Sequence, residues 1–149
     1  MQITYTKVTP QVINRNRNFY KNHARKAFVM WCAYEGLLDK VLTPEEMVKA
    51  KKEGKLPKDL NVHHKIPLSG SMDLFVNDFS NLSIIHRNTH RFITQNIYAP
   101  KAKRLSDKPY GSEIQIDDVI NYPYVDVDGI FEERRIQNLI NRRKLNGRY

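Results

Sequence analysis

Cysteine is nearly absent from this sequence, and long apolar runs are missing altogether. The 149 residues include one cysteine, Cys32, which excludes an internal disulfide and any zinc site built from cysteine pairs. No apolar stretch is long enough to cross a membrane, and the N-terminus lacks the basic and then apolar pattern of a Sec-type signal peptide. We therefore expect a single domain, residues 1–149, whose stability comes from the packing of its core.

Acidic residues are scarce outside the last third of the chain. Lys and Arg number 25 against 16 Asp and Glu, which gives a net charge of +9. Residues 1–60 carry 12 basic and 6 acidic side chains, residues 61–104 carry 6 and 2, and residues 105–149 carry 7 and 8. A basic surface in the first two thirds favours a partner that bears phosphates. The acidic segment, Glu113 to Glu133, would either cover the back of the core or shield the basic surface until that partner displaces it.

Apolar spacing and capping residues predict the first elements. A helix is expected from about Gln11 to Glu35, ended by Gly36, with Phe28, Trp31 and Cys32 in the core. A second helix is expected to begin at Thr43 and stop at Gly54. The alternating stretch Leu60 to Ile66 predicts a strand.

The middle and the end of the chain are read in the same way. A second strand is expected at Leu82 to Ile85, and Asn88 or Thr89 would then cap a helix that ends before Pro100. Ile114 to Ile120 reads either as a strand or as the start of a helix. A closing helix follows, with Glu132 and Glu133 in its first turn.

Histidines gather in one short part of the chain. His63, His64, His86 and His90 fall within 28 residues, around the predicted strand, loop, strand and helix. Adjacent side chains in a strand point to opposite sides, so His63 and His64 cannot easily bind one ion together. One of them can hold a metal while the other takes a proton from water.

These residues resemble a known motif. His63 to Leu68, then Asn81-Leu82, then His90 nine residues after that Asn, resemble the HNH motif of the ββα-metal nucleases. The lead-in Leu56 to Val62 resembles the HNH domains of bacterial toxins, including colicin-type DNases. The resemblance implies an α+β fold with a ββα-metal core over residues 56–98. A helical part would precede it at residues 1–55, and an extension with a closing helix would follow at 99–149.

The resemblance also implies a role for each motif residue. His64 matches the general base that deprotonates the attacking water. His63 and His90 match ligands of one divalent metal ion, and Asn81 matches the residue whose hydrogen bonds hold the loop and orient the base. The implied reaction is hydrolysis of a DNA phosphodiester, which leaves a 5′ phosphate and a 3′ hydroxyl.

The sequence departs from the family pattern in two places. Thr94 stands where colicin-type members have a further histidine, so the ion would keep more water, which favours Mg²⁺, with Mn²⁺, Ni²⁺ or Zn²⁺ as alternatives. The loop has Gly70 and Ser71 in place of a common glycine pair. His86 would be a further metal ligand if one continuous helix held it together with His90.

Basic residues near the motif are the expected contacts with nucleic acid. No separate sequence-reading module is visible, so we expect little sequence preference. The residues expected to contact phosphates are Lys65, Arg87, Arg91, Lys101, Lys103, Arg104 and Arg25.

The biology implied by the resemblance is that of an antibacterial toxin DNase. Such a protein would act in the bacterial cytoplasm, reach its target cell without a Sec signal, and meet an acidic immunity protein in the cell that makes it. A phage, mobile-element or defence-system HNH endonuclease is an alternative, and so is RNA as the substrate. A different class of function is a DNA-binding module whose histidines hold a structural metal, in which a chelator would lower stability and no cleavage would occur.

Overall fold

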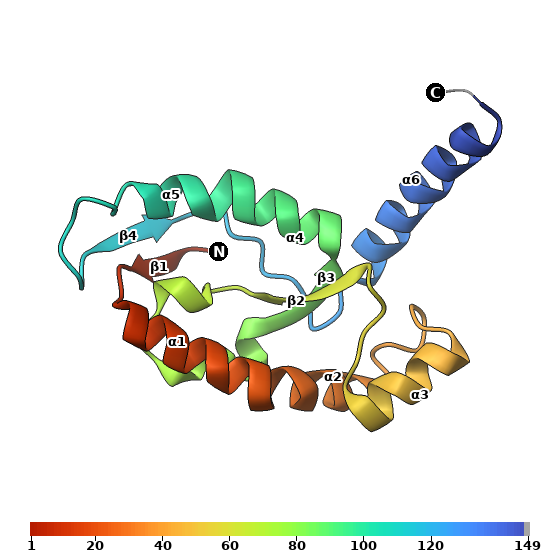
Figure 1. The fold of residues 1–149 in the computed structure, drawn as a ribbon, viewed down its shortest axis with the longest axis horizontal. Coiled ribbons are helices and arrows are strands. Elements are labelled where there is room, and N and C mark those ends of the chain that lie inside the picture. Colours follow the sequence, from red (N-terminus) through yellow and green to blue (C-terminus); the bar gives the residue numbers. More distant parts are fainter. Residues whose placement is uncertain (148–149) are drawn as a thin grey trace.

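The computed structural model describes residues 1–147 and has a mixed α+β fold, as expected (Figure 1). Its strands form two separate two-stranded antiparallel sheets, β1 with β4 and β2 with β3. In chain order the elements are β1 (Ile3–Thr6), α1 (Pro10–Phe19), α2 (Arg25–Tyr34), α3 (Pro44–Glu53), β2 (Leu60–His64), β3 (Leu82–His86), α4 (Arg87–Ile93), α5 (Ala99–Lys103), β4 (Glu113–Ile116) and α6 (Val127–Leu145).

The predicted N-terminal helix is present as α1 and α2. A π-helical segment, Tyr20–Ala24, joins them without a break. The helix begins after Thr9, whose side chain accepts from Val12 N, and Gly36 takes a left-handed φ of 77° just past its end. Phe28 and Cys32 are fully buried, as expected.

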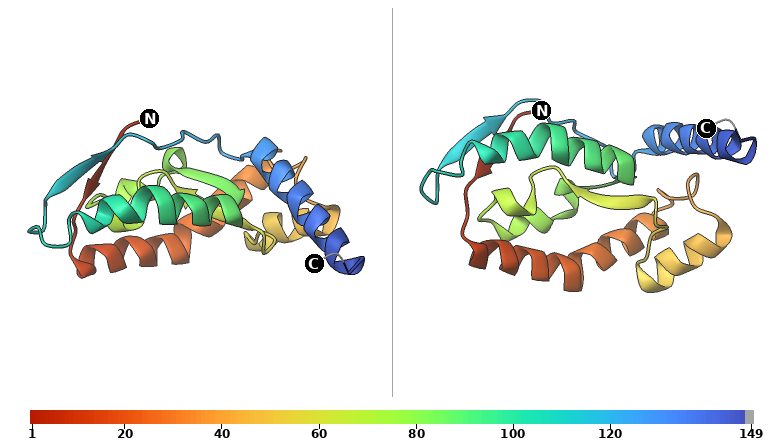
Figure 2. Two further views of the ribbon diagram at one scale, coloured as in Figure 1. Left: turned by 90° about the horizontal axis from the view of Figure 1, so that it is seen from above. Right: turned by 45° about the horizontal axis from the view of Figure 1, so that its top comes forward.

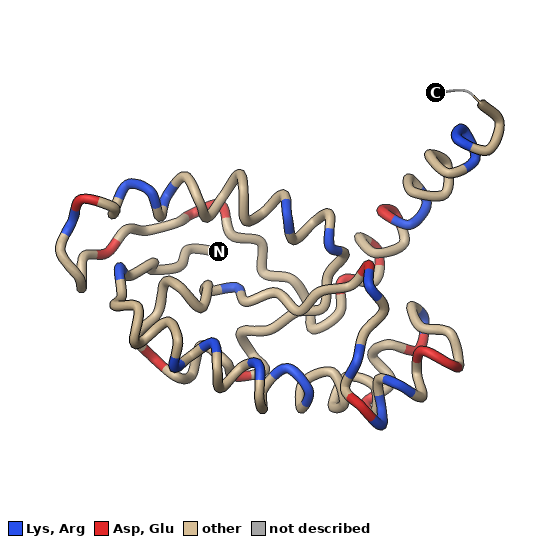
Figure 3. The backbone as a smooth tube through the Cα atoms, in the orientation of Figure 1, with Lys and Arg blue, Asp and Glu red and all other residues tan. Residues whose placement is uncertain are grey.

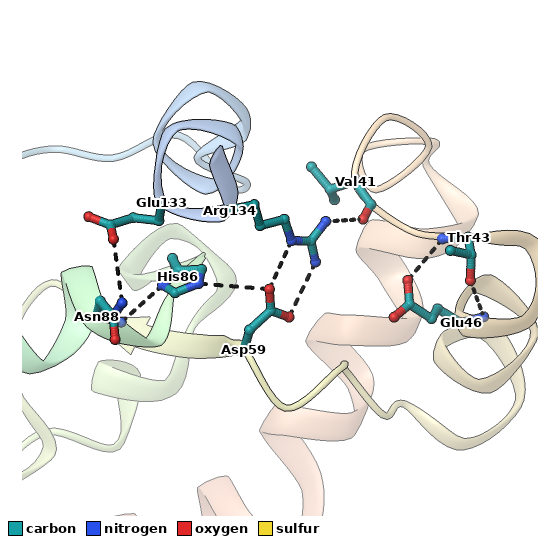
Figure 4. A network of polar contacts seen from close by, with 8 residues as sticks. All are labelled: Val41, Thr43, Glu46, Asp59, His86, Asn88, Glu133 and Arg134. Carbon is teal, nitrogen blue, oxygen red and sulfur yellow. Dashed lines mark hydrogen bonds and ion pairs between the residues drawn. The ribbon is translucent and has the colours of Figure 1, made fainter. Parts of the chain in front are cut away.

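Helix α3 has the predicted ends. Thr43 Oγ1 accepts from Glu46 N, and the Glu46 carboxylate accepts from Thr43 N, which makes a capping box (Figure 4). Gly54 ends the helix at a φ of 63°.

The β2–β3 hairpin separates two hydrophobic clusters. Ile84 and Ile85 are adjacent on β3 and point to opposite faces, so each belongs to a different cluster. The first cluster includes Phe28 and packs against α2, and the second includes Ile93 from α4. Figure 2 shows the hairpin lying between the N-terminal helix and α4. Both faces of the hairpin are therefore packed, and this packing fixes the positions of its ends.

Helix α4 follows β3 directly, but two details of its prediction were wrong. Its cap is His86, whose Nδ1 accepts from Asn88 N, rather than Asn88 or Thr89. The helical path also continues beyond Pro100, through the π-helical segment Thr94–Tyr98 into α5. Pro100 lies in the first turn of α5, where its missing N–H disrupts the path least.

The last third of the chain packs along the core. Residues 113–116 form the strand β4, and Val125 then makes a parallel bridge with Ile84. Helix α6 begins at Val127, so Asp128, and not Glu132 or Glu133, is the acid in its first turn. The helix extends away from the rest of the fold in Figures 1 and 2. Within residues 1–147, no helix is both long and apolar enough to cross a bilayer.

Candidate active site

Three of the clustered histidines meet at one cavity of about 470 Å³. His63 and His64 come from the end of β2, and His90 comes from α4. Both π-helical segments also contribute, Tyr20 from the first and Thr94 and Tyr98 from the second. None of the residues 105–147 lines this cavity, although Tyr122 of the acidic segment meets the ring of His63 edge-on at 6.0 Å between centroids.

His64 is held by contacts from the N-terminal helix and the loop. Its ring meets Tyr20 edge-on at 4.6 Å between centroids, and its Nε2 lies 3.0 Å from Asn77 Oδ1. Asn77 Nδ2 donates to the carbonyl of Asn16, so Oδ1 is the acceptor and His64 Nε2 carries the proton. The Nδ1 lone pair remains available.

The Nδ1 atom of His64 is open to the cavity. It takes part in no hydrogen bond with a described residue. Among the described residues, every fully buried side-chain nitrogen or oxygen has a hydrogen-bond partner. Nδ1 therefore contacts solvent.

His63 lies on the opposite side of β2, next to His90. The two ring centroids are 5.7 Å apart, and Tyr98 stacks parallel to His63 at 6.0 Å. No hydrogen bond from residues 1–147 engages either ring nitrogen of His63. His90 Nδ1 accepts from Asn61 Nδ2 at 3.2 Å. In this arrangement the ring nitrogens of His63 are free of protein partners, whereas Nδ1 of His90 is engaged.

Burial keeps these imidazoles neutral at pH 7. It lowers the pKa of His63 to about 3, with smaller contributions from the neighbouring charges of His90, His64 and Lys65. Burial also lowers the pKa of His64 to about 4, against the opposing hydrogen bond to Asn77, and it lowers the pKa of His90. A metal ligand and a general base both need an unprotonated nitrogen.

Asn81 ties together the two ends of the loop that follows His64. Its Oδ1 accepts from Ile66 N at 2.9 Å, and its Nδ2 donates to Ile66 O at 3.0 Å and Val76 O at 2.7 Å. These bonds fix the backbone between His64 and Asn77 at both ends. Asn81 thus holds the loop backbone, while its effect on the orientation of His64 stays a prediction.

Thr94 also reaches the site, and the loop glycine packs against a residue that lines it. A Cβ on Gly70 would lie 2.4 Å from the ring of Tyr5, which lines the cavity, so only glycine fits there. Thr94 lines the cavity from the π-helical segment that follows α4.

His86 is the motif-region histidine that does not join the site. Its Nδ1 accepts from Asn88 N and its Nε2 lies 3.7 Å from Asp59 (Figure 4). Because it ends β3 instead of sharing a helix with His90, the condition for a third ligand is not met. Within residues 1–147, no three His, Cys, Asp or Glu side chains gather as metal ligands.

The comparisons with known proteins find no relative. No family model matches the chain, and no curated protein or solved structure does either.

None of the predicted phosphate-contacting residues lines the cavity. Lys65 turns away and donates to Ser80 O, and Arg25 lies on α2 beside a separate groove. Lys101 is half-buried on α5. The remaining predicted cations are exposed on α4, on α5 and just after it; they are Arg87, Arg91, Lys103 and Arg104.

Sequence reasoning missed three residues of the site: Arg17, Tyr20 and Asn77. Arg17 lines the cavity and makes no side-chain hydrogen bond or ion pair within the described residues. The motif spacing contains no signal for the three, since α1, the π-helical segment after it and the loop supply them. In the sequence, the polar face of the N-terminal helix was the feature that could have pointed to a contribution from this helix to the site.

Proposed function

We propose that this chain is a metal-dependent endonuclease of the HNH type that hydrolyses DNA phosphodiester bonds with little sequence preference. The observation that carries this proposal is the arrangement of the three cavity histidines. His64 presents a free Nδ1 lone pair from one side of β2, while His63 and His90 are paired on the other. One imidazole with an open lone pair and a separate pair of imidazoles thus share one cavity, which supports the division into a base and metal ligands.

His64 acts as the general base. Its Nε2–H donates to Asn77, so the ring keeps one tautomer and Nδ1 accepts a proton from water. Tyr20 and the loop hold the ring in place. When the imidazole takes up the proton, the hydrogen bond to Asn77 stabilises the cationic form.

His63 and His90 hold the metal ion. The ring nitrogens of His63 have no protein partner within the described residues and are open to an ion. Asn61 Nδ2 faces His90 Nδ1, so the Asn61 amide would have to turn over and accept from Nδ1–H to leave Nε2 for the ion. Two protein ligands leave positions for water and for phosphate, as in catalytic sites. When bound, a divalent cation stabilises charge on the phosphate and on the leaving oxygen.

Neutral imidazoles suit Ni²⁺ or Zn²⁺ by ligand type, whereas the open positions and Thr94 suit a hydrated Mg²⁺ or Mn²⁺. The choice of ion is therefore a variable of the assay.

Arg17 faces the substrate phosphate from the N-terminal helix. Among the described residues it is the Lys or Arg that lines the cavity, it has no side-chain partner there, and a phosphodiester bound beside His64 would share the cavity with its guanidinium.

Cleavage of supercoiled plasmid tests the proposal. The folded chain is incubated with plasmid in Mg²⁺, Mn²⁺, Ni²⁺ or Zn²⁺, with EDTA as the control and a structured RNA as a second substrate. We expect nicking that depends on metal and stops in EDTA. A folded chain that cuts neither substrate with any ion, but loses thermal stability in EDTA, would instead be a metal-stabilised binding module.

A further inference from the structure

A second basic groove lies away from the histidines, between α2 and the end of α3. It has a volume of about 420 Å³. Four cations line it, Lys21, Arg25, Lys26 and Lys55, against one acid, Glu53. The groove therefore concentrates positive charge well beyond what the composition of the whole chain supplies.

The charge in this groove is largely uncompensated. Lys21 and Lys26 make no side-chain hydrogen bond or ion pair with any other described residue. Lys55 Nζ lies 4.0 Å from Glu53, and both side chains are mostly exposed, so that pair is weak. Cations that lack protein partners are available to an anionic ligand.

The groove has a fixed floor. Gly54 ends α3 directly against α2, where a Cβ would lie 2.8 Å from the carbonyl oxygen of Lys26 and 2.9 Å from its Cα. The close backbone approach sets the position of Lys55 relative to Lys26. The cations are thus arranged by packed backbone and not by a mobile loop.

One helix connects the groove with the histidine cavity. Arg17 lines the cavity, and Lys21 and Arg25 follow at four-residue intervals on the same helical path and line the groove. Figure 3 shows Lys and Arg recurring along this path. At 1.5 Å per α-helical residue and less across the π-helical segment, Arg17 and Arg25 are at most about 12 Å apart along the axis, the rise of about three nucleotides of one strand.

We propose that the groove of Lys21, Arg25, Lys26 and Lys55 binds the phosphate backbone of the nucleic acid, a few nucleotides from the scissile phosphate. This inference rests on the proposed function, since it assumes that the strand is cut beside His64. The regular row of cations matches a polyanion with regularly spaced charges. We therefore predict that contacts in the groove strengthen binding at a distance from the cleaved bond and independently of the base sequence of the nucleic acid.

Binding measured without cleavage tests the groove. A fluorescent DNA duplex of about 20 base pairs is titrated in EDTA, between about 50 and 200 mM salt. The variant Lys21→Gln/Lys26→Gln/Lys55→Gln is compared with Lys40→Gln/Arg142→Gln/Arg143→Gln, which removes the same charge from other exposed positions. We expect the groove variant alone to bind about tenfold or more weakly, with a salt slope reduced by about one for each lost phosphate contact.

Two results would overturn the proposal that this groove binds the phosphate backbone. Equal weakening in both variants would show that only net charge matters, and unchanged affinity in the groove variant would show that DNA lies elsewhere. The plasmid assay separates this failure from that of the proposed function. If the chain cuts plasmid but binds DNA equally well without the groove cations, the proposed activity stands and the groove is not a binding site. If the chain binds through the groove but never cuts, the groove stands and the proposed activity fails.

Discussion

His63 and His64 are chain neighbours, yet they have different surroundings. His64 points to the side of Tyr20 and Asn77, and His63 points to the side of Tyr98 and His90. This follows from the alternation of side chains along β2. The strand end thus places two imidazoles at one cavity with different partners, which allows them different functions.

Asn81 offers a test of positioning at the residue scale. Asn81→Ala removes three hydrogen bonds to Ile66 and Val76 and should lower the free energy of unfolding by about 2–3 kcal/mol. Because the loop carries Asn77, the partner of His64, we expect kcat to fall while KM changes little. Asn81→Asp keeps the acceptor and should recover part of both losses.

Urea unfolding and steady-state cleavage measure these effects. The control is Asn96→Ala, which removes one exposed hydrogen bond to Phe92 O on the helical path that begins with α4. If Asn81→Ala unfolds and cuts like this control, Asn81 does not hold the loop.

At the scale of elements, two π-helical segments flank the cavity. Tyr20 comes from one, and Thr94 and Tyr98 come from the other. A π turn fits more residues into one turn than an α-helix does, so it redirects the side chains that follow it. Irregular turns of this kind often mark functional sites, and here both adjoin the histidines.

Gly54 is the element-scale test, because it joins α3 to α2. Gly54→Ala forces a residue with a Cβ into a left-handed φ of 63° and against the backbone of Lys26. Gly111→Ala is the matched control, since Gly111 has a φ of 92° with open space around it. We expect losses of about 2–4 kcal/mol for Gly54→Ala and about 1–2 kcal/mol for Gly111→Ala, measured by urea unfolding. Equal losses would mean that the close packing of α3 on α2 contributes nothing.

Local signals predicted the elements that local chemistry determines. The capping box at Thr43, the stop at Gly54 and the alternation of the strand at Leu60 all depend on nearby residues, and these elements formed as expected. The pairing of Ile3 with Ile116 was not predicted, because partners so far apart in sequence carry no local pattern. The continuation through Pro100 was missed because a π-helical segment precedes it.

The candidate site likewise contains residues that local spacing reveals and residues that only the folded chain brings together. The histidines and Asn81 were recognisable from motif spacing, and the structure brings His63, His64 and His90 to one cavity. Asn77 and Arg17 were not recognisable, since only the folded chain brings α1 and the loop to His64.

At the scale of the whole molecule, Asp59 connects distant parts of the chain. It precedes β2 and accepts two hydrogen bonds from Arg134 of α6, at 2.8 and 3.3 Å, while Arg134 also donates to Val41 O (Figure 4). His86 Nε2 lies 3.7 Å from the same carboxylate. This network attaches the start of α6 to both the hairpin and the N-terminal half.

The ionisation of Asp59 gives this network a pH dependence. Partial burial acts to raise its pKa, but the hydrogen bond and charge of Arg134 outweigh burial, so the folded pKa lies below the ordinary 3.8. The stabilising contribution is complete above pH 3.8 and is lost as pH falls through the lower, folded value. Asp59→Asn should therefore cost about 1–2 kcal/mol at pH 7, and less as pH drops below 3.8.

Urea unfolding at pH 7, 5 and 3.5 measures this difference. Glu132→Gln is the control, because it removes an exposed ion pair with Arg135 from the same helix and should change little. An Asp59→Asn penalty that grows toward acid pH would contradict the assigned direction of the pKa shift.

The most direct test of the account is the cleavage rate of His64→Ala. The variant and the unaltered chain are compared on supercoiled plasmid with the best metal ion, with circular dichroism to show that both are folded. His23→Ala is the control, since His23 is exposed on the N-terminal helix and does not line the cavity. The account predicts a rate lower by about 100 to 10,000-fold for His64→Ala, with metal and DNA binding retained, and no change for His23→Ala. A folded His64→Ala that nicks plasmid as fast as the unaltered chain would contradict it.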